Sequence, residues 1–84
     1  MPAVTIYTKS WCPYCSAAKD LLKKKNVAFT EIPVKTADDQ TSMAKKAGGR
    51  STVPQIWVGE RHVGGCDDLY ALDDRGELDR LLAA

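Results

Sequence analysis

Two cysteines separated by two residues, Cys12 and Cys15, follow an apolar run at residues 4–7 and stand at the start of a helical pattern. At a strand-to-helix turn, this spacing suits a dithiol that opens and closes a disulfide. It also requires a strand that leads directly into a helix, as in α/β proteins. The motif therefore predicts an α/β fold with redox chemistry at this turn.

Length and charge limit what else the chain can be. Its 84 residues predict a single domain over residues 1–84, since there is no room for a second core. The net charge of +1 gives no positive surface potential that would indicate nucleic-acid binding. The lysine run at 23–25 is explained by a solvent-exposed helix end. Residues 1–3 show no signal-peptide pattern, and no apolar stretch approaches the ~20 residues that span a bilayer. We therefore expect a cytoplasmic protein without nucleic-acid or membrane partners, and such a reducing compartment favours a catalytic or metal-binding use of the motif.

Strand and helix patterns alternate along the chain. β-Branched residues at 3–8, apolar on both faces, predict a central strand. The next expected elements are a helix at 13–26, a strand at 27–34 with Pro33 at an edge, a polar helix at 37–47 ended by Gly48 and Gly49, and strands at 55–58 and 61–63. Leucines between 69 and 82 predict one or two helical pieces around Gly76. The order β-α-β-α-β-β-α predicts a four-stranded mixed sheet with helices on both faces.

The helix start gives the two cysteines different roles. Pro13 fits the first helical position, because its missing N–H would have no partner there. Cys12 would then cap the helix, where free N–H groups and the helix dipole favour a thiolate, and Lys9 can add positive charge. We expect Cys12 to be the nucleophile and Cys15, one turn further, to be a more buried resolving thiol. The alternative is a pair of inert cysteines that act as small apolar residues.

The segment Thr52-Val53-Pro54 precedes a predicted strand. Proline there cannot donate a ladder hydrogen bond. If its peptide bond were cis, the backbone of Val53 would be open to pair with an extended peptide, but the sequence leaves the isomer open.

The segment Gly64-Gly65-Cys66-Asp67-Asp68 predicts a turn that opens into a helix. Free N–H groups at such a helix start would hold a carboxylate, and the Asp67 side chain could take an ammonium nearby. A carboxylate beside an ammonium is the head of a free amino acid or of a γ-glutamyl group. The alternative is a plain aspartate cap on the helix.

Four segments stand together in the order and spacing of a known family: Tyr7-Thr8-Lys9, Cys12-Pro13-Tyr14-Cys15, Thr52-Val53-Pro54-Gln55-Ile56 and Gly64-Gly65-Cys66-Asp67-Asp68-Leu69. On these segments, and over essentially its whole length, the chain resembles the glutaredoxins, close to the small bacterial dithiol type. The resemblance implies a thioredoxin fold and a glutathione-dependent oxidoreductase acting on protein disulfides and glutathionylated proteins. It implies glutathione as co-substrate, with no tightly bound cofactor and no metal.

The resemblance also implies roles for single residues. Cys12 attacks a disulfide or a glutathionyl group, and Cys15 resolves a protein disulfide. The peptide bond before Pro54 is cis, and the Val53 backbone pairs with the cysteinyl unit of glutathione. The implied glutathione-binding residues are Lys9, Tyr14, Arg50, Thr52, Val53, Pro54, Gly65, Cys66 and Asp67.

In the implied site, each end of glutathione has its own partners. Backbone N–H groups of Cys66 and Asp67 take the γ-glutamyl carboxylate, and the Asp67 side chain receives the ammonium. Tyr14 and Lys9 line the groove. The glycyl carboxylate meets Lys9 or Arg50.

Two residues depart from this pattern or lie outside it. Trp11 is more reminiscent of thioredoxins, and it either covers the thiol or widens substrate contact. Cys66 is either a bystander or a site of regulatory oxidation.

Alternative functions follow from the same residues. Cys12, Cys15, Cys66 and His62 form the inventory of a Cys3His zinc site. Some glutaredoxins bridge a [2Fe-2S] cluster between two protomers, although Pro13 resembles the members that do not. Two further alternatives are a thioredoxin-like protein reduced by a flavoprotein reductase and a peptide-binding module with a vestigial dithiol. Since no sequence feature indicates an oligomer, a monomer is the default.

Overall fold

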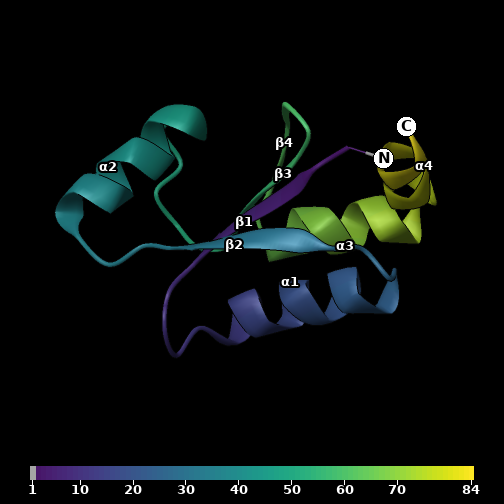
Figure 1. Ribbon diagram of the computed structural model, residues 1–84, viewed down its shortest axis with the longest axis horizontal. Helices are drawn as coiled ribbons and strands as arrows, with labels where there is room; N and C mark the ends of the chain where they lie inside the picture. The colour runs from purple at the N-terminus through teal and green to yellow at the C-terminus, as the bar shows by residue number, and fades with distance from the viewer. Residues whose placement is uncertain (1) are drawn as a thin grey trace.

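The computed structural model describes residues 2–84 (Figure 1). Its strands are β1 Val4–Thr8, β2 Phe29–Pro33, β3 Gln55–Val58 and β4 Arg61–Gly64, and its helices are α1 Pro13–Lys24, α2 Ala37–Lys46, α3 Cys66–Asp74 and α4 Glu77–Ala83. The predicted alternation is confirmed, and the C-terminal leucines form two helices rather than one. Within residues 2–84, no helix is both long enough and apolar enough to cross a membrane.

The strands of residues 2–84 form one sheet in the order β2-β1-β3-β4. β1 pairs in parallel with β2 and antiparallel with β3, and β3 pairs antiparallel with β4. β1 is therefore central, as its two apolar faces predicted. β2 is an edge strand, and Pro33 stands at its last position, where a missing N–H is tolerated.

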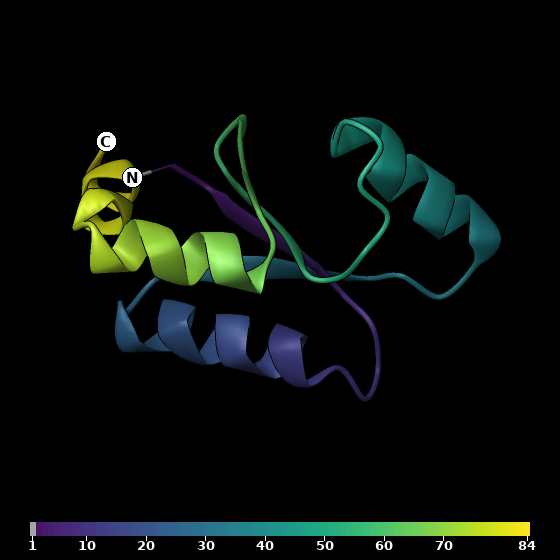
Figure 2. The ribbon, with the colours of Figure 1, turned by 180° about the vertical axis from the view of Figure 1, so that it is seen from behind.

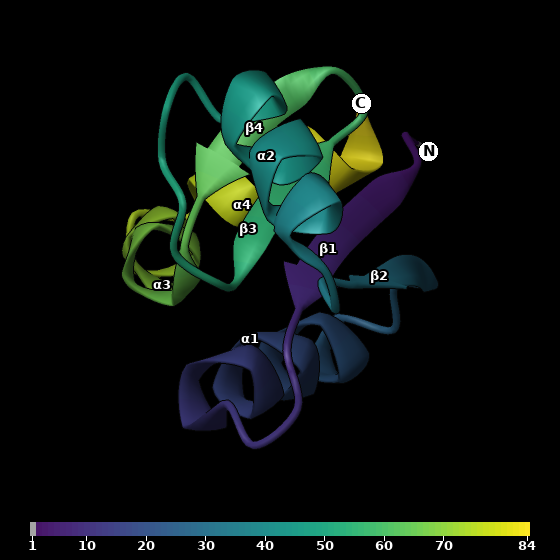
Figure 3. The same cartoon turned by 90° about the vertical axis from the view of Figure 1, so that its left-hand side faces the viewer.

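Helices cover both faces of the sheet. α1 and α3 lie side by side on one face, and α2 lies on the other (Figures 1 and 2). The end view in Figure 3 shows the strands between these two layers. The larger core forms between the sheet and α1, α3 and α4, and its fully buried side chains include Ile6, Leu22, Ile56, Leu69 and Leu78. A smaller cluster of Tyr7, Val34 and Met43 fills the α2 face.

The turn between α1 and β2 is longer than predicted. α1 ends at Lys24 rather than near residue 26, because Asn26 adopts a left-handed backbone with φ 56° that cannot continue a helix. The following strand begins at Phe29 rather than at residue 27. Val27 is buried, but its N–H bonds to the carbonyl of Leu22 instead of joining the sheet. The apolar side chain of Val27 indicated a buried position. The sequence pattern could not show whether that position belongs to a strand or to a turn.

Two glycine positions end helices as expected. Gly48 follows α2 with φ 64°, and Gly76 separates α3 from α4 with φ 73°. This left-handed region is accessible to glycine without a Cβ clash. The break at Gly76 lets α4 turn back so that Leu78 and Leu82 enter the larger core.

Candidate active site

The start of α1 holds the first thiol against the helix N-terminus. Cys12 is the N-cap residue, in extended conformation, and Pro13 occupies the first helical position as predicted. The backbone N–H of Cys15 donates a hydrogen bond to Cys12 Sγ at 3.1 Å. The first turn of α1 carries no acidic side chain to oppose a negative sulfur. The sulfur therefore stands against unpaired N–H groups and the positive end of the helix dipole.

The second thiol lies in a different environment. Cys15 is buried, with 2% of its surface exposed, whereas Cys12 is half-buried. Burial, together with the hydrogen bond to Cys12 and the nearby charge of Cys12, raises the pKa of the Cys15 thiol to about 11. Cys15 is therefore a neutral thiol at physiological pH while Cys12 is reduced. This asymmetry matches the expected division into an attacking and a resolving cysteine.

A groove of about 280 Å³ lies beside the dithiol; we call it the α3 groove. Its lining comprises Tyr14, Arg50, Thr52, Val53, Pro54, Gly65, Cys66, Asp67 and Asp68. It thus brings together eight of the nine residues expected at the binding site, Lys9 being the exception. The Val53–Pro54 peptide bond is cis, as the resemblance implied. The Val53 carbonyl oxygen lies 4.0 Å from Cys12 Sγ, so this wall of the groove reaches the reactive sulfur.

The other wall of the α3 groove is the N-terminus of α3. Asp68, not Asp67, performs the capping, since its Oδ2 accepts the Gly65 N–H at 2.8 Å. The N–H groups at the start of a helix have no partner within it, and those of Cys66 and Asp67 belong to this first turn. Asp67 is exposed and makes no ion pair or side-chain hydrogen bond within residues 2–84. Its carboxylate therefore remains available to a ligand, which favours the binding interpretation of Asp67 over the capping one.

An ion pair joins the two walls. Arg50 Nη1 lies 3.1 Å from Asp68 Oδ2, and both side chains are about half exposed. The Gly65 N–H bond and this arginine hold the pKa of the Asp68 carboxyl below its usual value, so it stays ionised. A Cβ at Gly64 would clash with Asp68 Oδ2, so this glycine permits the pair to form. Of the two candidates for the glycyl carboxylate, Arg50 lines the α3 groove.

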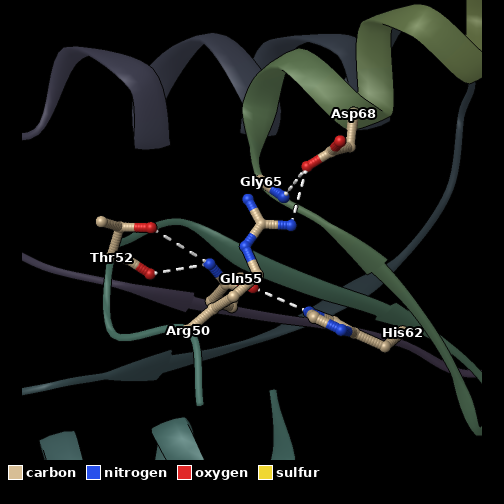
Figure 4. Close-up of polar contacts among 6 residues, drawn as sticks. All are labelled: Arg50, Thr52, Gln55, His62, Gly65 and Asp68. Carbon is tan, nitrogen blue, oxygen red and sulfur yellow. Dashed lines mark hydrogen bonds and ion pairs between the residues drawn. The ribbon is translucent and has the colours of Figure 1, made fainter. Parts of the chain in front are cut away.

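A buried amide supports the loop that forms the first wall (Figure 4). The Gln55 side chain is fully buried and donates from Nε2 to the Thr52 carbonyl at 3.0 Å and to Thr52 Oγ1 at 3.3 Å. Its Oε1 is 2.7 Å from His62 Nε2, so His62 donates there. Burial and the nearby Arg50 lower the pKa of His62, and the imidazole is neutral at pH 7. Buried polar side chains of this kind fix one local geometry because every partner must be kept.

A second space lies on the opposite side of β1; we call it the β2 hollow. It measures about 570 Å³ and lies between the loop after β1, the start of α1 and the end of β2. Both thiols line it, and so do Lys9 and Trp11. Lys9 therefore does not line the α3 groove, contrary to the expectation that it lines the groove with Tyr14. Trp11 is fully exposed and does not cover the thiol.

The comparisons with known proteins agree with this geometry. A family model described as Glutaredoxin matches residues 4–63. The chain belongs to the glutaredoxin family. It is 56% identical to the glutaredoxin of Pseudomonas aeruginosa, with both chains covered completely, and 54% identical to glutaredoxin 3 of Escherichia coli, with 98% of this chain and 99% of the relative covered. The crystal structure of a buckwheat glutaredoxin–glutathione complex matches with a TM-score of 0.87 at 27% identity, covering 98% of this chain and 77% of that one.

Membership of the glutaredoxin family confirms the predicted thioredoxin fold and makes the protein a thiol–disulfide oxidoreductase. The arrangement gives no support to the zinc alternative. Within residues 2–84, no three His, Cys, Asp or Glu side chains are grouped so that they could hold a metal ion. His62 is engaged elsewhere, hydrogen-bonded to Gln55 and stacked on Trp57 with ring centroids 4.6 Å apart. Cys66 is buried, and burial and the Asp67 charge raise the pKa of its thiol.

Three residues that support the α3 groove were not expected there from sequence. Asp68 stands three positions after Gly65, the spacing of a helix cap and its partner, and that signal was present. Gln55 is a polar residue between two apolar ones at the start of a predicted strand, which is a weaker signal. His62 reaches Gln55 only through the pairing of β3 with β4, and no local pattern indicated it.

The pKa of Cys15 predicts how the thiols react with an alkylating agent. At pH 8 we expect iodoacetamide to modify Cys12 and to leave Cys15 unmodified, because the Cys15 thiolate forms only near pH 11. In a Cys12→Ala variant the hydrogen bond and charge of Cys12 are gone, so Cys15 should react at lower pH than in the wild type, while burial keeps it slow. Mass spectrometry of peptides across a pH series measures both rates. Equal modification of the two thiols at pH 8 would contradict the asymmetry.

The Gln55 network predicts a stability change. Gln55→Leu removes the acceptor of His62 and the donor to Thr52, and we expect it to lower the free energy of unfolding by about 1–3 kcal/mol. Gln40→Leu is the matched control, since Gln40 is less buried and bonds only the Ser51 carbonyl. Urea denaturation measures both variants. A Gln55→Leu protein as stable as the control would show that the network contributes little.

Proposed function

We propose that this glutaredoxin is a glutathione-dependent dithiol–disulfide oxidoreductase that reduces protein disulfides and glutathione mixed disulfides. The observation that carries the proposal is the α3 groove, which runs from the Val53 carbonyl beside Cys12 Sγ to the exposed Asp67 carboxylate. With the reactive sulfur near one end and a carboxylate at the other, the groove suits a γ-glutamyl peptide whose cysteine sulfur reaches Cys12. The buckwheat glutaredoxin–glutathione complex supports the choice of ligand.

Each part of glutathione has a partner in this proposal. The γ-glutamyl carboxylate binds the N–H groups of Cys66 and Asp67 at the helix N-terminus, where the dipole favours an anion. Its ammonium pairs with Asp67. The cysteinyl unit pairs with the Val53 backbone, and the glycyl carboxylate meets the guanidinium donors of Arg50 that Asp68 does not use.

The proposed reduction of a protein disulfide takes two exchanges. The Cys12 thiolate attacks one substrate sulfur, a Cys12–substrate disulfide forms, and the other substrate sulfur leaves as a thiolate that takes up a proton. Cys15 then loses its proton and attacks Cys12 Sγ, which releases the second substrate thiol and closes the Cys12–Cys15 disulfide. One glutathione thiolate reopens that disulfide at Cys12, and a second one attacks the glutathionyl sulfur and leaves as oxidised glutathione. A glutathionylated substrate needs Cys12 alone.

The electrostatics of Cys15 fit this order of events. Part of what raises its pKa is the hydrogen bond with Cys12 and the charge of Cys12. When Cys12 becomes part of a mixed disulfide, that charge is gone, and the Cys15 thiolate forms more readily. The resolving thiol is therefore activated by the first exchange, although burial still opposes its ionisation.

The proposal includes the setting in which the enzyme works. Residues 1–84 act as one domain and as a monomer. The protein works in a reducing cytoplasm, where the dithiol does not persist as a structural disulfide. No tightly bound cofactor is required, because glutathione supplies the electrons.

Two cysteine variants test the assignment of roles. Cys12→Ser should abolish activity on every disulfide substrate, because the nucleophile is lost. Cys15→Ser should retain reduction of a glutathione mixed disulfide and lose reduction of protein disulfides. The measurement is NADPH oxidation coupled through glutathione and glutathione reductase. Equal losses in both variants on both substrates would overturn the roles, and activity only with thioredoxin reductase would point to the thioredoxin-like alternative.

The ammonium contact of Asp67 gives a separate test. Asp67→Ala should raise the KM for a glutathionylated peptide about two- to fivefold with little change in kcat, because the charge pair of an exposed carboxylate with the bound ligand is removed. Asp74→Ala is the matched control, as this exposed aspartate lies at the far end of α3. An unchanged KM in the Asp67 variant would remove this residue from the site.

A further inference from the structure

Two spaces of different size border the dithiol. Glutathione extends one residue to either side of its cysteine, and the α3 groove of about 280 Å³ accommodates such a ligand. The β2 hollow is about 570 Å³, and Cys12 and Cys15 themselves line it. β2 and β3 flank β1 on opposite sides, so the two spaces diverge from the reactive sulfur. The mechanism proposed for glutathione leaves the β2 hollow without a use.

Trp11 gives this hollow an apolar surface that none of residues 2–84 covers. Its side chain is 100% exposed, although tryptophan is highly buried on average. Its backbone adopts φ 59°, a left-handed conformation that bulky residues rarely take and that recurs at functional sites. Large aromatic side chains in this situation often supply much of the energy of protein interfaces.

The charges around the β2 hollow favour an anionic ligand. Glu31 accepts the Thr8 hydroxyl at 2.6 Å and pairs with Lys19 at 3.1 Å, so its charge is largely compensated. Lys9 is exposed and makes no ion pair within the described part of the chain. The hollow therefore carries an uncompensated positive charge within its lining, beside Trp11 and next to Cys12.

We propose that the β2 hollow receives the polypeptide around the cysteine of a protein disulfide, as an extended segment that carries a carboxylate side chain next to that cysteine. This inference rests on the proposed role of Cys12 as nucleophile. A polypeptide continues beyond its cysteine in both directions and needs surface outside the α3 groove. Because Cys12 lines the hollow, a ligand bound there contacts Cys12, as a polypeptide whose disulfide is attacked by Cys12 must do. Trp11 packs on the segment, Lys9 pairs with its carboxylate, and the exchange at Cys12 Sγ is the one described above.

The test is single-turnover transfer from the pre-reduced protein, with no reduced glutathione present, measured as the second-order rate of thiol release. The first two probes are short synthetic peptides closed by an internal disulfide, identical except for a glutamate or a lysine beside one cysteine. The third probe is the mixed disulfide of glutathione with cysteamine. The variants are Trp11→Ser, the conservative Trp11→Tyr, Lys9→Gln and, as a charge control distant on α2, Lys45→Gln.

We expect Trp11→Ser to lower the rate constant for both peptides roughly tenfold, the effect of losing a buried aromatic contact, and to leave the glutathione probe unchanged. Trp11→Tyr should recover most of the loss. The wild type should prefer the glutamate peptide about two- to fivefold, as an exposed charge pair allows. Lys9→Gln should remove this preference, and Lys45→Gln should keep it.

Three results would overturn the inference. Equal losses on all three probes in Trp11→Ser would mean that Trp11 acts on Cys12 itself. Unchanged peptide rates would mean that the β2 hollow is not used. A dimer of the wild type in sedimentation, lost in Trp11→Ser, would assign the hollow to a second copy of the chain. Peptide effects as expected, with no reaction of the glutathione probe, would support the hollow and instead contradict the proposed glutathione dependence.

Discussion

The 3.1 Å hydrogen bond from the Cys15 N–H to Cys12 Sγ joins the fold to its chemistry. The same sulfur satisfies a backbone donor that α1 would otherwise leave unpaired and stands at the positive end of the helix dipole. Pro13 has no N–H, so the first helical position adds no further unpaired donor that would need a cap. The helix start and the dithiol are thus one structural unit, presented by the end of β1.

The α3 groove depends on polar contacts within and behind its walls. Gln55 reaches back to Thr52 and forward to His62, which ties the loop before β3 to β4. Arg50 and Asp68 join that loop to α3. The bond from Gln55 to Thr52 and the ion pair of Arg50 with Asp68 fix the loop before β3, which the sheet alone would leave unsupported. A groove for a small flexible ligand benefits from such support, because walls held in advance lose less conformational entropy on binding.

Local rules predicted much of this structure, and long-range pairing accounts for the rest. Pro13 and Gly76 each act through their own backbone, so the sequence was sufficient to place them. Neither the position of Lys9 outside the α3 groove nor the bond between Gln55 and His62 follows from local pattern. Both depend on which strands flank β1 and on their register. The division of roles between Asp67 and Asp68 is an intermediate case. The sequence offered both an aspartate cap and a ligand-binding aspartate, and one residue of offset decides which carboxylate accepts the Gly65 N–H.

The contrast between the thiols explains why one helix turn supports two successive exchanges. A resolving thiol that was ionised from the start would compete with Cys12 for incoming disulfides. Burial opposes this, because it is the largest of the causes that raise the pKa of Cys15 to about 11, and it leaves only 2% of the residue exposed. The thiol is nevertheless one turn from Cys12, so it needs no large movement once a mixed disulfide has formed there. In the proposed reaction, order thus follows from depth in the structure: the sulfur at the helix cap reacts first, and the buried sulfur then attacks the disulfide formed at Cys12.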